Sequence, residues 1–450
     1  MKMKDFNLTE GNILRKLLKV AAPIMATSFM QMTHNLIDMF WLSRLSSGAV
    51  AAAGSAGMYL WLSMALLFVG RMGSEIGVSQ NVGRGNMDEA KNYGQNAFTL
   101  AAFLGIVYCL FAISGRGLLI GFFGIEDADV VIYAELYLAY VALAVPFFYV
   151  NAAMSGAFVG FGNTKLPFYA TSGGVVINII LSPIFIFLLD MGVVGAAVST
   201  TLSQMVVTVM FVISMMKYKN RPFEKFAFFV KPARKYINQI FRWGLPVAVE
   251  SALFTMLTMT VTRFVAAFGV EALAVLRVGS QIEALSWLVG GGFASAVAAF
   301  AGQNFGAKKY DRIRSGFKIS LQAMFLWGLI ISLFMFFFAE QLMSIFFSDP
   351  LEVQMGREYL RIFAFMQIPT CMEGVAAGCF RGRGRTMRPS INSTVFNALR
   401  VVLSYYLSLT PLGLSGIWIG LAVGATLRGI FLIGWYIIDA KKMPKCKAIG

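Results

Sequence analysis

Three polar side chains in the run His34-Asn35-Leu-Ile-Asp38 could bind a proton or a cation. His34 and Asp38 are four positions apart and Asn35 and Asp38 are three apart, so one face of a helix can carry all three. A buried carboxylate is costly unless a proton or a cation neutralises its charge, and oxygen ligands suit hard cations. The run therefore predicts H⁺ or Na⁺ binding at Asp38. The alternative is that Asp38 lies near a helix end and is simply solvated.

Further ionisable residues interrupt apolar segments elsewhere. Arg71 and Glu75 are four positions apart and predict an ion pair within one helix. The second half mixes acids with arginines: Glu250, Glu283, Glu373, Arg263, Arg277, Arg400 and Arg428. Because an unpaired charge inside a bilayer is costly, we expect opposite charges to pair between helices. The alternative is a cavity for a charged substrate, for which the candidate side chains are His34, Asn35, Asn151, Glu250, Glu373 and Arg400.

The elements that must position these side chains are membrane spans. The chain has 450 residues, of which 58% are hydrophobic and only 13% are charged. A soluble domain of this length carries about twice that share of charge, so an ordinary soluble globular protein is excluded. We predict an all-α integral membrane protein whose twelve spans are Asn12–Trp41, Ser47–Gln80, Ala90–Ser114, Asp129–Val159, Lys165–Leu189, Gly192–Lys217, Tyr236–Ala267, Glu271–Gln303, Asp311–Ala339, Glu352–Phe380, Arg388–Leu409 and Gly413–Ile438.

The positive charges lie mostly on one side of this predicted topology. The N-terminus, the tail and every second loop hold most of the 38 Lys and Arg, whereas the opposite loops hold only Arg44, Arg116, Arg357 and Arg361. The positive-inside rule then places both termini and the central linker in the cytoplasm, and the chain in the cytoplasmic membrane. The net charge of +16 thus reflects orientation in a lipid bilayer, and we expect no nucleic-acid partner.

An internal repeat relates the two halves. A shift of 223 residues aligns Pro23 with Pro246 and the turn Gln80-Asn81-x-Gly83 with Gln303-Asn304-x-Gly306. We predict an N-terminal lobe (1–216), a basic cytoplasmic linker (217–235), and a C-terminal lobe with the tail (236–450). Two parallel six-helix lobes of this kind predict alternating access around a site near the bilayer midplane. Pro23 interrupts the first span and is a candidate hinge.

Motifs for enzymatic chemistry are missing from the sequence. It contains no GxxxxGK[ST] loop for ATP and no HExxH zinc motif, and His34 is the single histidine. We therefore expect a protein that is not an enzyme and that uses no cofactor beyond a coupling ion, H⁺ or Na⁺.

These landmarks resemble the multidrug and toxic compound extrusion (MATE) family of transporters. The resemblance covers nearly the whole chain and rests on Pro23, Asn35-x-x-Asp38, the glycine motifs Gly156–Thr164 and Gly378–Thr386, and the paired Gln-Asn-x-Gly turns. It implies export of small molecules, driven by Na⁺ or H⁺, and Asp38 as the coupling acid of the N-terminal lobe. We expect a monomer that exports amphipathic organic compounds or drugs. The alternative is a flippase for a lipid-linked saccharide, whose anionic head the intramembrane arginines could hold.

The resemblance also implies partners for Asp38. In relatives with a described cation site, an Asn, an acid one turn later and a Thr in the next span complete it, and the matching positions here are Asn178, Ser182 and Thr200. Ser182 is not an acid, which lowers the formal charge of the site and leaves both ions open; bound Na⁺ would use Asp38, Asn178 and Thr200.

The second lobe indicates a branch of the family. The NorM branch carries acids in its seventh and tenth spans, at positions that here read Phe254 and Thr370. The chain therefore resembles the DinF-like branch more closely.

Overall fold

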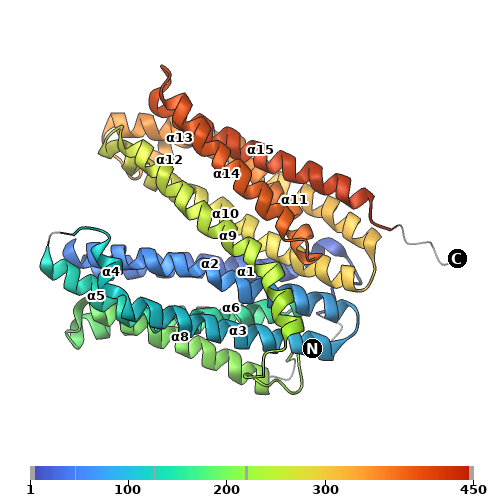
Figure 1. Ribbon diagram of the computed structural model, residues 1–450. Helices are drawn as coiled ribbons and strands as arrows, with labels where there is room; N and C mark the ends of the chain where they lie inside the picture. The colour runs from blue at the N-terminus through green and yellow to red at the C-terminus, as the bar shows by residue number, and fades with distance from the viewer. Residues whose placement is uncertain (1–5, 46, 126, 218–220, 445–450) are drawn as a thin grey trace. The chain divides into compact units, whose positions relative to one another are not determined.

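The computed structural model describes residues 6–45, 47–125, 127–217 and 221–444, and among these it contains helices and no strand. The first half of the chain forms α1 (Ile13–Ser43), α2 (Ser47–Gly83), α3 (Met87–Ser114), α4 (Arg116–Gly121), α5 (Ala128–Ala142), α6 (Val145–Phe161), α7 (Lys165–Pro183), the π-helical segment η2 (Ile184–Leu188) and α8 (Gly192–Lys217) (Figure 1).

The second half forms α9 (Arg234–Ala266), α10 (Val270–Gly306), α11 (Tyr310–Phe337), α12 (Ala339–Ser344), α13 (Pro350–Gly382), α14 (Met387–Ser408) and α15 (Gly413–Lys441). The chain divides into two compact units. One comprises Met1–Leu8 and Lys19–Ala248, and the other comprises Thr9–Leu18 and Val249–Gly450. Both α1 and α9 therefore contribute residues to each unit, whereas the predicted lobe boundary lies at the linker.

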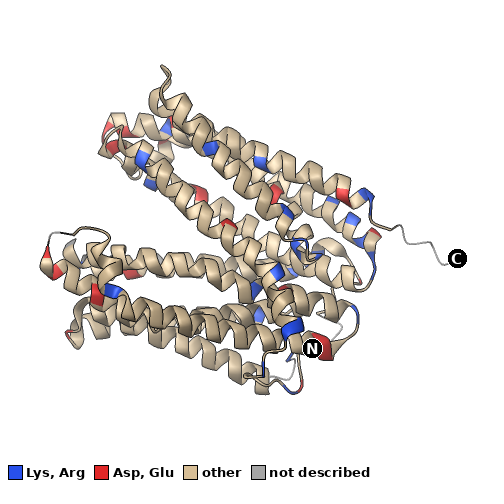
Figure 2. Cartoon of the chain, in the orientation of Figure 1, with Lys and Arg blue, Asp and Glu red and all other residues tan. Residues whose placement is uncertain are grey.

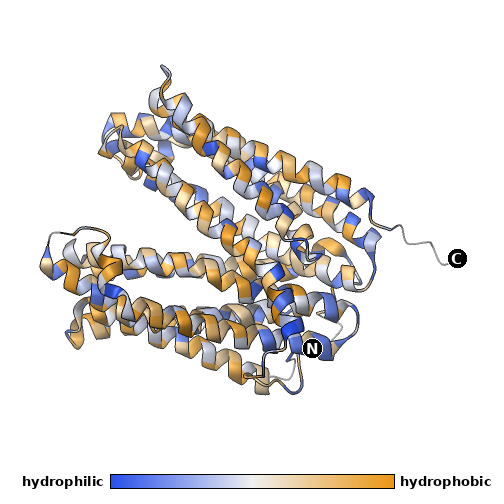
Figure 3. Ribbon diagram, in the orientation of Figure 1, coloured by the Kyte–Doolittle hydropathy of each residue, from blue (hydrophilic) through white to orange (hydrophobic). Residues whose placement is uncertain are grey.

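The predicted all-α membrane architecture is confirmed. Ten of the described helical segments are long and apolar enough to cross a membrane, and hydrophobic residues follow the helices of each unit (Figure 3). The two remaining long segments are α1 and α14. Polar side chains such as Asn392, Asn397 and Arg400 lower the hydropathy of α14. In Figure 2 most of the ribbon in each unit carries no charged residue.

The fourth span differs from the expectation of one continuous helix. It consists of α5 and α6, which are separated at Leu143 and Ala144. Pro146 lies in the first turn of α6, where its missing N–H does not interrupt the helical hydrogen bonds. The same residue could not donate to a carbonyl one turn earlier, so a continuous helix through this point is disfavoured. The short helices α4 and α12 were also not among the predicted elements.

Glycines bring α2 and α6 into backbone contact in the first unit. A Cβ atom at Gly156 would lie 2.6 Å from the carbonyl oxygen of Arg71, and one at Gly160 would lie 2.6 Å from that of Glu75. Such distances leave no room for a side chain. The motif Gly156–Thr164 is therefore a helix-packing motif, as small residues at four-residue spacing commonly are in membranes.

The second unit repeats this contact. Cβ atoms at Gly378 and Gly382 would clash with the carbonyl oxygens of Ala294 and Ala298, so α13 packs on α10 as α6 packs on α2. Each of these four residues lies 222 or 223 positions after its counterpart. The sequence repeat thus corresponds to a repeated helix contact.

The turn that follows α2 and α10 is also repeated. The Asn81 side chain donates to the Gly77 carbonyl at 2.8 Å, and the Asn304 side chain donates to the Phe300 carbonyl at 2.8 Å. The residue that closes the turn has a positive φ in both copies, 77° at Gly85 and 59° at Lys308. The paired Gln-Asn-x-Gly motifs therefore form equivalent helix ends.

The described part of the basic linker packs on α3. The Val230 amide donates to Thr99 Oγ1 at 3.3 Å, and the Ala233 amide donates to Asn96 Oδ1 at 3.0 Å. Phe223 is buried in the apolar core of the first unit. Residues 221–233 make these defined contacts because their aromatic side chains bury apolar surface.

Candidate functional site

The proposed coupling acid lies on α1 beside the histidine one turn earlier. The Nε2 atom of His34 is 3.4 Å from Oδ2 of Asp38, and both side chains are partly buried. The i, i+4 spacing predicted this proximity. The side chain of Asn35 lies outside the described part of the structure, so its predicted contribution stays a prediction.

A buried polar cluster joins α7 to α8 in the same unit. Ser182 and Asn178 are one turn apart on α7, and the Ser182 hydroxyl donates to Asn178 Oδ1 at 3.2 Å. Asn178 Nδ2 lies 3.5 Å from Thr200 Oγ1, and the hydroxyl oxygens of Ser182 and Ser199 are 2.9 Å apart. All four residues are buried, so each hydrogen bond offsets the cost of removing its polar groups from water.

Ser182 connects this cluster to the acid. Its hydroxyl lies close enough to the Asp38 carboxylate to interact with it, and Tyr137 on α5 is also close enough to interact electrostatically with Asp38. The first unit thus brings together Asp38, Ser182, Asn178 and Thr200, the residues that the family resemblance implied. Sequence reasoning did not identify Tyr137 or Ser199, because neither belongs to a motif that marks the site.

Asn151, a predicted cavity residue, is buried on α6 and bonds to α8. Its amide nitrogen donates to the Gln204 carbonyl at 3.0 Å and to Gln204 Oε1 at 3.1 Å. Its amide oxygen accepts from the Thr208 hydroxyl at 2.8 Å. The side chain therefore holds α6 against α8 with both of its polar atoms.

The charge pairing expected in the second half is present between α13 and α15. Arg428 Nε lies 2.8 Å from Glu373 Oε2, and Arg428 Nη1 donates to Asn397 Oδ1 at 3.0 Å. Both charged side chains are buried. Arg428 on α15 thus bonds to the Glu373 carboxylate on α13 and to the Asn397 amide on α14, so these buried polar groups have partners across three helices.

A second pair joins α9 to the end of α13. Glu250 accepts from the Ser390 hydroxyl at 2.7 Å, and Arg381 Nη2 lies 3.5 Å from Glu250 Oε2. These contacts satisfy the carboxylate of Glu250, which was a predicted cavity residue.

Arg400 and Glu283 make further polar contacts in the second unit. Arg400 donates to the Thr258 hydroxyl at 3.1 Å, and its guanidinium lies 4.9 Å from the centre of the Phe254 ring. The Tyr359 hydroxyl donates to the Glu283 carboxylate. The Nε atom of Arg400 is buried without a hydrogen-bond partner among the described residues, so Arg400 is the cavity candidate of this unit with an unused donor.

Two predictions on single helices concern Arg71 and Pro23. Arg71 Nε lies 4.0 Å from Glu75 Oε2, so the ion pair within α2 is confirmed. Pro23 lies inside α1, and the Thr27 hydroxyl donates to its carbonyl at 2.8 Å. Because Pro23 has no N–H to donate to the carbonyl one turn earlier, α1 can bend at this point.

The candidate site of the first unit is defined by the polar groups that lie near Asp38. It holds a single carboxylate, an imidazole, hydroxyls and an amide oxygen. Among the described residues, no three His, Cys, Asp or Glu side chains come close enough together to hold a metal ion. The site is therefore suited to a proton or to a weakly held monovalent cation rather than to a transition metal.

Comparison with known proteins assigns the family. The MatE family model matches residues 23–184 and again 246–406, so the two matches begin 223 residues apart, as the internal repeat does. The chain belongs to the MatE family, the multidrug and toxic compound extrusion family that its motifs resemble, and it is a multi-pass membrane transporter rather than an enzyme.

Curated relatives and solved structures agree with this assignment. The chain is 27% identical to the probable multidrug resistance protein NorM of Thermotoga maritima, covering 94% of this chain and 92% of that protein. It is 23% identical to the probable multidrug resistance protein YoeA of Bacillus subtilis, covering 96% of each. An outward-facing multidrug resistance MATE transporter of the MOP superfamily matches with a TM-score of 0.91 at 22% identity, over 98% of this chain and 99% of that one. The flippase alternative is not favoured.

Proposed function

We propose that this transporter exports amphipathic organic compounds, including drugs, across the cytoplasmic membrane in exchange for a cation that binds at Asp38. The observation that carries the proposal is the 3.4 Å distance between His34 and Asp38, together with the proximity of Asp38 to Ser182 in the buried α7–α8 cluster. The names of the relatives, which are multidrug resistance proteins, support the substrate class.

Of the two coupling ions, we propose the proton. The carboxylate of Asp38 is the single acid of the cluster, and Ser182 stands where cation-binding relatives would carry a second one. Hard cations bind more tightly as the number of charged ligands increases, so one carboxylate is a weak Na⁺ site. A proton, in contrast, needs only that carboxylate.

Protonation would change the hydrogen bonds that link α1 to α7. The ionised carboxylate of Asp38 only accepts, so it favours donation from Ser182; the protonated form can itself donate. The Ser182 hydroxyl is then free to donate to Asn178, as it does in this structure at 3.2 Å, or to Ser199 at 2.9 Å. Ion occupancy thereby favours one arrangement of these helices over another, which is what coupling requires, and Pro23 would allow α1 to respond.

The topology and the assembly are part of the proposal. We propose that both termini face the cytoplasm, because the positive charges gather on that side of the predicted topology, and that a monomer is the working unit. Cysteine accessibility at the ends of the chain in right-side-out vesicles tests the orientation.

We also propose that the protein belongs to the DinF-like branch, since Phe254 and Thr370 replace the acids of the NorM branch.

Transport by the purified protein tests the coupling. Proteoliposomes carrying wild type, Asp38→Asn or Asp88→Asn would receive an imposed pH gradient or an imposed Na⁺ gradient, with ethidium as the amphipathic cation. Asp88 is a matched control because it is exposed at the start of α3 and pairs with Lys91. Wild type and Asp88→Asn should move ethidium with the pH gradient alone, and Asp38→Asn should not.

Two outcomes would contradict the proposal. Ethidium movement that follows only the Na⁺ gradient would show that the coupling ion is Na⁺ and not the proton. If the Asp38→Asn variant inserts normally and still couples export to either gradient, Asp38 is not the coupling acid.

A further inference from the structure

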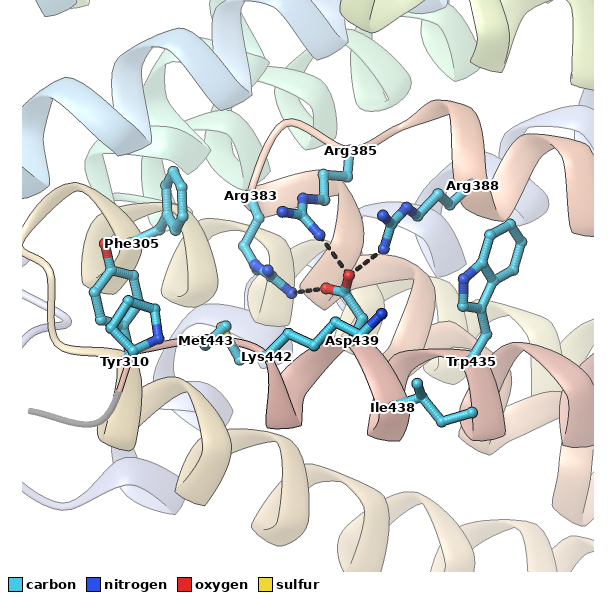
Figure 4. A pocket seen from close by; sticks show the side chains of 11 residues that line it. Phe305, Tyr310, Arg383, Arg385, Arg388, Trp435, Ile438, Asp439, Lys442 and Met443 are labelled. Atoms are coloured by element: carbon cyan, nitrogen blue, oxygen red, sulfur yellow. Dashed lines mark hydrogen bonds and ion pairs between the residues drawn. The ribbon is translucent and has the colours of Figure 1, made fainter.

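Three arginines converge on one carboxylate at the C-terminal end of α15. Arg383 Nη1 lies 2.6 Å from Asp439 Oδ2, and Arg385 and Arg388 both donate to Asp439 Oδ1 (Figure 4). Arg383 and Arg385 come from the segment between α13 and α14, and Arg388 from the first turn of α14. We call these four residues the arginine cluster.

The cluster forms one wall of a cavity of about 310 Å³. Phe305, Tyr310 and Trp435 supply aromatic walls, and Lys442 adds a fourth cation. The side chain of Asp439 is only 4% exposed, whereas those of Arg385 and Arg388 are 44% and 34% exposed. The carboxylate of Asp439 is thus covered by its arginine partners, whereas the guanidinium groups of Arg385 and Arg388 are accessible to a ligand.

Positive charge in this cavity exceeds negative charge. Four cations line it against the single carboxylate of Asp439. Partial burial, and then the charges of Arg383 and Arg388, lower the pKa of Arg385, as expected where cations are crowded. The Nε atom of Arg383 is buried and has no hydrogen-bond partner among the described residues. A bound anion would reduce the repulsion between these cations and could accept hydrogen bonds from donors that have no partner.

The walls of the cavity are held in place independently of any ligand. Arg314 on α11 donates to the Ala440 carbonyl at 3.2 Å and also to the carbonyl of Met443, so it fixes the end of α15. The guanidinium of Arg388 lies 5.6 Å from the centre of the Phe380 ring and 5.7 Å from the centre of the Trp435 ring. The cations therefore do not need to be ordered by the molecule that binds them, which favours affinity.

The first unit forms the equivalent helix ends without these arginines. A shift of 222 residues aligns Arg383, Arg385 and Arg388 with Phe161, Asn163 and Leu166. The first unit thus builds the same helix ends, with the same glycines, from apolar or neutral side chains. The arginine cluster is an addition specific to the second unit.

We propose that the arginine cluster is a binding site for a phosphate group, carried by an anionic phospholipid or by a soluble phosphate compound. Guanidinium groups recognise phosphate oxygens through paired hydrogen bonds, and two partly exposed arginines can approach one phosphate together. Ile438, which lines the same cavity, is 59% exposed and offers an apolar surface beside the cations. Such a combination suits a lipid headgroup with its chains along α15. The site is independent of the compound that is exported.

Native mass spectrometry of the full-length protein in neutral detergent tests this site. The probes are phosphatidylglycerol, phosphatidylcholine as the zwitterionic comparison, and inorganic phosphate as a competitor. Phosphatidylglycerol should bind in preference to phosphatidylcholine, and Arg385→Gln/Arg388→Gln should weaken that binding about tenfold or more, as the loss of hydrogen bonds to a charged group implies.

Arg357→Gln is the matched control. Arg357 is also a half-buried arginine of the second unit that pairs with a carboxylate, Glu340, but it lies outside the cavity. Its variant should bind phosphatidylglycerol as wild type does. Thermal unfolding in the same detergent checks folding, and Arg385→Gln alone, at the most exposed arginine of the cluster, should give a smaller loss if the double variant is unstable.

The two sources of the phosphate give different results. Phosphatidylglycerol that binds and is not displaced by millimolar inorganic phosphate identifies the lipid, whereas saturable binding of inorganic phosphate that Arg385→Gln weakens identifies a soluble ligand. The proposal is overturned if neither probe binds, or if the folded arginine variants bind them as tightly as wild type.

Discussion

The Nε2 atom of His34 lies 3.4 Å from the Oδ2 atom of Asp38, one helical turn away on α1. The imidazole is thus the nearest titratable neighbour of the proposed coupling acid on its own helix. It can donate a hydrogen bond to the ionised carboxylate, and such bonds to a charged group contribute about 1.5–3 kcal/mol.

Replacing His34 should therefore slow transport without uncoupling it. We expect His34→Leu to lower ethidium export driven by the pH gradient by about tenfold, the equivalent of one such bond. His34→Gln keeps a donor and should retain more of the activity. Proteoliposome transport measures both variants, and equal activity in His34→Leu and wild type would show that the contact does not contribute to the transport rate.

Adding an acid to the cluster should change its ion preference. Ser182 lies on α7 close to Asp38, so Ser182→Asp places a second carboxylate near the first. Two carboxylates attract Na⁺ more strongly than one does. Export by Ser182→Asp should then respond to an imposed Na⁺ gradient. Ser182→Ala is the control, since it removes the hydroxyl without adding charge and should not gain a response to Na⁺.

The contact between α2 and α6 should tolerate no side chain at Gly156. A Cβ atom there would lie 2.6 Å from the backbone oxygen of Arg71, so Gly156→Ala must push the helices apart, at a cost of about 1–3 kcal/mol. Gly54, in α2, has no atom within 4 Å of a Cβ position, and Gly54→Ala should be neutral or stabilising. Thermal unfolding in detergent compares the two. Equal melting temperatures would contradict the close packing.

The buried pair of Glu373 and Arg428 should be sensitive to removal of one partner. Arg428→Met leaves the Glu373 carboxylate buried without its cation, which typically costs about 3–5 kcal/mol. The double variant Glu373→Gln/Arg428→Met removes both charges and should recover much of that loss. A double variant less stable than Arg428→Met would mean that the two residues do not act as a pair.

The two repeated turns share a backbone conformation but differ in the residue that adopts it. Gly85 and Lys308 occupy equivalent positions with positive φ, and only glycine adopts this conformation without strain. Gly85→Ala should destabilise the protein by about 1–2 kcal/mol. Lys308→Gly should have a smaller or opposite effect on the melting temperature, because the lysine already bears that strain.

Much of the spatial arrangement of the proposed coupling site could be predicted without coordinates. The i, i+4 spacing placed His34 beside Asp38, and the family resemblance selected Asn178, Ser182 and Thr200, which the fold brings together. Tyr137 and Ser199 were missed because single polar residues are frequent in membrane helices and no local pattern distinguishes them.

The amino-acid sequence by itself determined that the chain spans a membrane, that it repeats a six-span unit, and that it belongs to its family. Apolar length, charge asymmetry and repeated motifs are properties of the chain that need no coordinates. The tertiary structure alone decided which polar side chains meet, such as Ser182 with Ser199, or Arg383 with Asp439 across 56 positions. The physical reason is that lipid-facing and buried surfaces of a membrane helix are similarly apolar, so hydrophobic periodicity does not specify how each helix is rotated against its neighbours.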